Sequence, residues 1–258
     1  MKMPPLTRTL AAYRTERGFT LVELMVAMTV ALFLLNGLVT ILQGIRNTVQ
    51  SQRQLSQLED NERFAMTLIA EIVESAGYYP NPAANSAAST LTGTSAPSAF
   101  TSAGSPTIVG VANASAQGDT ITNRYAAALN DNVFNCSGNQ NTAVAGFDSW
   151  ENTFSVNAQN QLACSVYSPV TNTTTTVPLV SGVQKMTISY GVNTLGTTSG
   201  SCVDTYKTSA QMTGVDWGNV CSVVVTLVFL NSAAPPGSPN TVTFTQVIPV
   251  MNTAGVNT

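Results

Sequence analysis

The chain has 258 residues, of which 44% are hydrophobic and only 9% are charged, and its formal net charge is −3. This length suits one substantial domain with an additional segment. The low charge argues against a nucleic-acid binder, which needs a basic face. Because the sequence contains no histidine, it excludes Ser-His-Asp and Cys-His catalysis and histidine-rich metal sites.

The N-terminal part combines a basic segment with a long apolar run. The basic segment ends at Arg17, and Glu23 is the only charge between Arg17 and Arg46. As a helix, residues 19–42 would extend about 36 Å, more than the roughly 30 Å of a bilayer's hydrocarbon core. We therefore predict a transmembrane helix with its basic flank in the cytoplasm and the rest of the chain exported.

An ordinary secretory signal has a small-residue cleavage site after its apolar stretch, but here Gly18 precedes that stretch. Cleavage at Gly18 would leave the apolar helix on the product. The sequence Gly18-Phe19-Thr20-Leu21-Val22-Glu23 resembles the class III signal of type IV prepilins, whose pattern is G-F-T-L-x-E. The resemblance implies cleavage after Gly18 by a prepilin peptidase and N-methylation of Phe19.

Glu23 is the anomalous residue of the apolar run. A carboxylate that faces lipid costs about 3 kcal/mol on insertion scales, so Glu23 should have a partner. The resemblance implies that this partner is the α-amino group of a neighbouring subunit, which makes Glu23 a residue of subunit assembly. The alternative is an ordinary anchor helix that carries a stray glutamate.

No proline occurs between Phe19 and Pro80, and we predict one helix over about 19–76. Within the apolar half of this helix, Gly37 in the pair Asn36-Gly37 lowers the helix propensity. We expect either a bend at this point or an undisturbed helix, and we rate the two equally. In the outer half, helical spacing predicts a packed face made of Leu55, Leu58, Ala65, Ile69, Ile72 and Ala76, widened by Leu68 and Val73.

The remainder of the chain is predicted to be a loop followed by strands. Residues 78–106 are rich in Ala, Ser, Thr and Pro and predict a loop that is either disordered or a functional surface. Short connections between the β-like runs favour antiparallel pairing, and residues 220–230, apolar on both faces, should form a central strand against the helix. The predicted strands are 107–111, 119–125, 153–156, 161–166, 175–180, 183–192, 220–230 and 241–250.

The predicted fold class is α+β, and it resembles that of type IV pilins: a long N-terminal helix whose C-terminal half packs on a mainly antiparallel β-sheet domain. The expected parts are a cleaved leader, a transmembrane and fibre-core half-helix, an amphipathic half-helix, a low-complexity loop and a β-rich head. They cover residues 1–18, 19–42, 43–77, 78–106 and 107–258.

All four cysteines lie in the part that should be exported, where disulfides are favoured over thiols. Three pairings are possible, and we predict the one that closes the two shortest loops, Cys136–Cys164 and Cys202–Cys221. The alternative, a zinc site, lacks a C-x-x-C motif and any histidine. We expect no metal and no cofactor.

Two pairs of carboxylates remain as weak candidates for catalysis. Asp148 and Glu151 flank Trp150, and Asp204 and Asp216 lie between the last two cysteines. Solvated loop acids are far more common than catalytic pairs. We therefore predict that the chain is not an enzyme and has no small-molecule substrate.

Several shorter stretches of the chain resemble PilW-type minor pilins. They are residues 61–65, 76–78, 118–121, 179–183, 188–191 and 217–220. The resemblance implies a minor pilin that is inserted in the inner membrane and helps to initiate, or caps, a type IV pilus used in adhesion, twitching motility or DNA uptake. The alternatives are a J-type pseudopilin of a type II secretion system and an adhesin module at the fibre tip.

The expected partners follow from the same resemblance. They are other minor and major pilins through the N-terminal helix, the prepilin peptidase and the assembly platform of the inner membrane. We expect no direct binding of nucleic acid. Before assembly the chain should lie in the bacterial inner membrane with its C-terminal domain in the periplasm, and after assembly in the fibre at the cell surface.

Overall fold

The computed structural model describes residues 18–93, 97–113, 115–142, 145–195, 202–234, 237 and 239–251. The chain divides into two compact units, residues 1–51 and 52–258. Most of the predicted leader, residues 1–17, lies outside the described residues, and so do residues 94–96 of the predicted loop.

Helix α1 spans Leu21–Glu74 and confirms the predicted long helix to within two residues at each end. It continues through Asn36-Gly37 without interruption, where the Thr40 hydroxyl donates to the carbonyl of Asn36 at 3.0 Å. The helix ends before Gly77, whose φ of 80° lies in the left-handed region that glycine adopts without strain. The Gly77 N–H then donates to the carbonyl of Arg124 at 2.8 Å.

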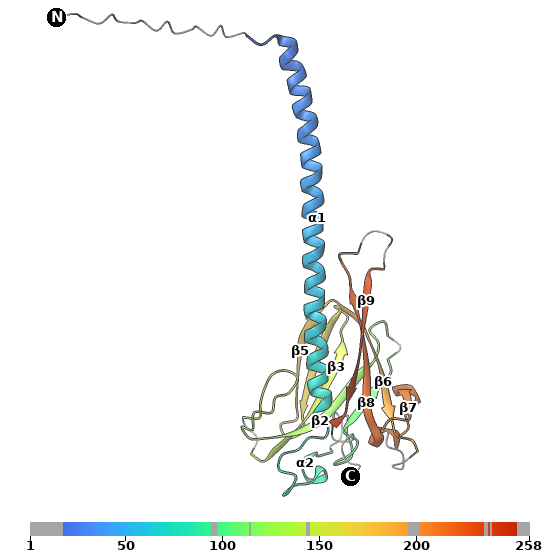
Figure 1. Cartoon of the computed structure of the whole chain (residues 1–258). Helices are drawn as coiled ribbons and strands as arrows, with labels where there is room; N and C mark the ends of the chain where they lie inside the picture. The colour runs from blue at the N-terminus through green and yellow to red at the C-terminus, as the bar shows by residue number, and fades with distance from the viewer. Residues whose placement is uncertain are drawn as a thin grey trace, which may run out of the picture. The chain divides into compact units, whose positions relative to one another are not determined.

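The β-rich domain contains two antiparallel sheets (Figure 1). The first has the strand order β1-β2-β3-β4-β5, with strands Ile108–Val111, Thr120–Ala128, Phe147–Val156, Gln161–Ser168 and Thr173–Ser181. The second has the order β7-β6-β8-β9, with strands Thr205–Thr208, Val183–Val192, Val220–Leu230 and Thr241–Pro249. Two short 3-10 helices, Ser209–Gln211 and Asp216–Asn219, lie between β7 and β8.

The antiparallel pairing and the central position of β8 confirm the sequence-based expectations. Strand β7 was not predicted, because its four residues carry too short an alternation to be recognised. The division of the strands between two sheets was not predicted either. Alternation identifies strands but does not say which strands pair.

A backbone junction around Gly118 connects the two sheets. The N–H of Asp119 donates to the carbonyl of Met186 in β6 at 2.8 Å, and the N–H of Met186 donates to the carbonyl of Gln117 at 3.0 Å. The carboxylate of Asp119 accepts from the N–H of Ile188 at 2.9 Å. The segment that leads into β2 of one sheet is thereby paired with β6 of the other.

The last turns of α1 and both sheets share one hydrophobic core. Ala65, Ile69 and Val73 on the helix are completely buried in it. Leu55, predicted to belong to this face, is instead 45% exposed. The buried face begins only at Leu58, because the residues that cover α1 do not reach the turn before it.

The low-complexity segment is folded onto the domain. It contains a short helix, α2, at Ala87–Thr90, which Ser86 begins with a capping box. Leu91 and Phe100 are buried. Of the two expectations for this segment, disorder is therefore wrong for its described part.

Candidate functional site

The N-terminal end of α1 presents the predicted processing site. Gly18, Phe19 and Thr20 lie outside the helix and are exposed. A Cβ added to Gly18 would meet no described atom within 4 Å. The described fold therefore places no steric demand for glycine at position 18.

Thr20 and Glu23 form the first turn of α1. The Thr20 hydroxyl accepts from the N–H of Glu23 at 3.3 Å, and the Thr20 carbonyl accepts from the N–H of Leu24 at 3.2 Å. Thr20 is thus the N-cap and Glu23 the third helical residue, an arrangement typical of helix starts. The partial positive charge of the helix end favours a carboxylate at this position.

The Glu23 side chain is exposed, and no ion pair of Glu23 is found within the part of the chain that the structure describes. The large apolar side chains around it are exposed as well, from Phe19 at 80% to Leu42 at 46%. Helix α1 contains a stretch long and apolar enough to cross a membrane. An apolar surface of this extent needs lipid or other helices to cover it.

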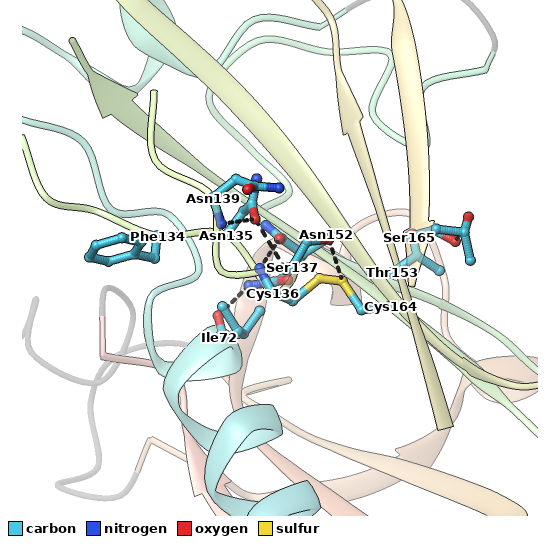
Figure 2. The surroundings of a disulfide bond; sticks show 12 residues. Ile72, Phe134, Asn135, Cys136, Ser137, Asn139, Asn152, Thr153, Cys164 and Ser165 are labelled. Atoms are coloured by element: carbon cyan, nitrogen blue, oxygen red, sulfur yellow. Dashed lines mark hydrogen bonds between the residues drawn. A yellow bond between two sulfur atoms is a disulfide. The ribbon is translucent and has the colours of Figure 1, made fainter. Parts of the chain in front are cut away.

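The disulfides Cys136–Cys164 and Cys202–Cys221 are both present, in the pairing expected from the sequence. The first lies against the last turns of α1 (Figure 2). Asn152 beside it accepts from the N–H of Cys136 at 2.9 Å, and Asn123 donates to the carbonyl of Ile72. This disulfide therefore sits where the strands of the first sheet meet the helix.

The acidic residues that were weak catalytic candidates have structural hydrogen-bond or ion-pair partners. Asp148 and Glu151 are three positions apart on β3, so they lie on opposite faces of the strand. Asp204 accepts from the backbone N–H groups of Thr194 and Leu195 at 2.7 and 2.9 Å. Asp216 is instead paired with Lys207 at 2.9 Å. Each carboxylate therefore has its own structural partners.

No pattern in the sequence indicates the role of Arg124. This residue is completely buried on β2, directly opposite Glu151 on β3. Its guanidinium donates to the carbonyls of Thr92, Ser102 and Pro106 at 3.1, 2.6 and 3.1 Å and lies 4.5 Å from the centre of the Phe100 ring. One buried cation thereby holds several turns of the low-complexity segment.

Burial lowers the pKa of Arg124 to about 10, against the attraction of Glu151, which raises it. Burial raises the pKa of Glu151, against hydrogen bonds from Ser98 and the N–H of Ala99, which lower it. The only signal in the sequence is a single arginine within the β-like run 119–125. Such a residue is hard to distinguish from one on a solvated strand face.

A comparison with known protein families identifies a motif at the N-terminal end of α1. The model of the prokaryotic N-terminal methylation motif matches residues 13–35. This match and the apolar helix α1 fit a membrane-anchored type IV prepilin.

A second family model, described as Type IV Pilus-assembly protein W, matches residues 148–253. Together, the two matches support a minor pilin of the type IV pilus. No curated protein matches the chain significantly.

Proposed function

We propose that the chain is a structural subunit, not an enzyme, that initiates or caps a type IV pilus. A prepilin peptidase would cut the Gly18–Phe19 bond, and the new N-terminus at Phe19 would be methylated. The subunit would wait in the inner membrane with its head in the periplasm and then enter the fibre through α1. The PilW match supports a pilus rather than a secretion pseudopilus.

The observation that carries this proposal is the exposed apolar half of α1 with one carboxylate in its first turn. An unpaired charge is costly in an apolar fibre core, and a correctly placed neighbour relieves that cost. The α-amino group at Phe19 of a neighbouring subunit would supply such a cation. Glu23 would thus select the register of one helix against the next.

A comparison of variants on the same helix tests the pairing. In Glu23→Ala and Glu23→Gln, we expect processing to continue but the amount of the chain in purified pili to fall at least tenfold. Glu59→Ala is the matched control, because Glu59 is an exposed glutamate of α1 beyond the apolar run. Normal incorporation of both Glu23 variants would refute the pairing role.

A further inference from the structure

The head domain contains a polar cavity that pilus assembly does not explain. It has a volume of about 180 Å³ and is lined by 13 residues, all but two of which carry an amide, a hydroxyl or a carboxylate in the side chain. Its walls come from the loop before β3, from β3 and β4, and from the turn into β5. All of its lining residues belong to the unit of residues 52–258.

Two acceptors in this cavity have unmet hydrogen-bonding capacity. Gln140 Oε1 is buried and has no hydrogen-bond partner among the described residues. Asp148 is also buried, and no Lys or Arg of the described chain forms an ion pair with it. Among the described residues, its carboxylate accepts only from Ser168 at 2.8 and 2.9 Å and from the indole of Trp150 at 2.8 Å. A buried carboxylate with spare acceptor sites favours a ligand that donates.

Burial raises the pKa of Asp148, against the hydrogen bonds from Ser168 and Trp150, which lower it. This is the environment of a charge that lacks a compensating cation.

The cavity wall is held in place by its own bonds. The Asn135 side-chain carbonyl accepts from the N–H groups of Ser137 and Asn139 at 3.0 and 3.1 Å, which closes the loop on itself (Figure 2). The disulfide Cys136–Cys164 links this loop to β4. On the opposite wall, Ser168 accepts from the N–H of Thr171 at 3.2 Å. A pre-organised wall loses little entropy when a ligand binds.

We propose that this cavity binds one unit of a neutral, hydroxyl-rich sugar. Each sugar hydroxyl both donates and accepts, so it can donate to Gln140 and Asp148 and accept from the amides and hydroxyls of the remaining wall. An ammonium ion would satisfy the carboxylate but could not accept a hydrogen bond from the amides and hydroxyls of the wall. At about 180 Å³, the cavity lies below the roughly 300 Å³ typical of pockets for drug-sized ligands, which limits it to a single small ring.

We treat such a sugar as a ligand and not as a substrate, because Glu151, the other carboxylate of β3, lies on the opposite face of the strand. The inference goes beyond assembly of the pilus. It would give the assembled fibre a contact with glycans, and it stands even if the role of Glu23 in assembly is refuted.

Trp150 provides a direct reporter, because its indole donates to Asp148 at the cavity and the chain has only one other tryptophan, Trp217. The full chain is purified in a sugar-free detergent and its tryptophan emission is titrated with methyl glucoside, methyl galactoside, methyl mannoside and N-acetylglucosamine. We expect a saturable change with at least one of them, at a Kd below about 10 mM for so small a ligand. Trp217→Phe should keep this change.

The variant Gln140→Leu should raise the Kd about tenfold, the effect of one lost hydrogen bond. Gln159→Leu makes the same substitution at an exposed turn outside the cavity and should leave the Kd unchanged. No saturable response to any of the four sugars in calorimetry and fluorescence would overturn the proposal. So would an equal response in Gln140→Leu, or saturation by choline alone.

Discussion

Arg124 shows how one residue changes the character of a whole segment. A stretch rich in Ala, Ser and Thr buries too little apolar surface to order itself. Here a buried guanidinium supplies three hydrogen bonds to carbonyls of that stretch, and Glu151 supplies the opposite charge. The order of the segment therefore depends on a side chain outside it.

Replacement of Arg124 by an uncharged residue should strongly destabilise the fold. In Arg124→Met, the three carbonyls lose a charged donor and Glu151 loses its counter-charge, so we expect the free energy of unfolding to fall by at least about 3 kcal/mol. Denaturant unfolding measures the loss, and limited proteolysis should show faster cleavage within residues 78–106.

Two further variants give the matched comparison. Arg63→Met, on an exposed face of α1, should change the free energy of unfolding by no more than about 0.5 kcal/mol. Addition of Glu151→Gln to Arg124→Met should cost less than the two single changes together, because the double variant leaves no unpaired charge. Strict additivity would contradict the coupling of the two charges.

Asp216 predicts a specific dependence of stability on pH. Hydrogen bonds from Thr213 and Lys207 lower the pKa of Asp216 to about 2. Because the unfolded value is near 4, this group stabilises the fold above about pH 4 and loses its contribution as the pH falls towards 2. Asp216→Asn should therefore lower the Tm at pH 7 and leave it close to the wild-type value at pH 2. An equal difference in Tm at both values would refute this.

At the scale of the elements, the long helix and most of the strands could be predicted from the sequence. The way in which they pack together could not. Helical spacing correctly placed Ala65, Ile69 and Ile72 in the core, because an amphipathic stripe reports its own period. Helical spacing wrongly predicted Leu55 to be buried, because the spacing of apolar residues does not indicate where the covering domain ends. The strands were recognisable from β-branched residues, yet the two sheets depend on contacts between distant segments, such as those of Asp119 with Met186.

The candidate site divides in the same way. The prepilin signature around Gly18 and Glu23 is local in sequence and was visible at once. The polar cavity could not be predicted from the sequence, because it combines Gln140, Asp148 and Ser168 from three separate segments. Polar residues of these types are common in this chain, so only their position in the fold sets them apart.

The junction between the sheets offers a test at this scale. Gly118 has a φ of 84°, and a Cβ there would collide with the carbonyl of Met186. Gly118→Ala should destabilise the chain by about 2 kcal/mol or more, through backbone strain and overpacking together. Gly138→Ala is the control, since its φ is 78° but its Cβ would meet no described atom within 4 Å. Equal Tm losses in the two variants would contradict the close contact.

For the whole molecule, one helix serves two environments. Up to Leu42 its side chains need lipid or other helices, and from Leu58 onward they complete the core of the head. Because α1 is continuous, a subunit that inserts this helix among others carries its head with it. Under the proposed function, the subunit would wait in the membrane and its destination would be the fibre.

The most direct measurement is mass spectrometry of the chain isolated from purified pili. Our account predicts that its N-terminal peptide begins at Phe19, carries one added methyl group on the α-amino nitrogen and is joined to the intact apolar run. A chain in the pilus fraction that retains residues 1–18, or one that is cut after the apolar run, would contradict the account.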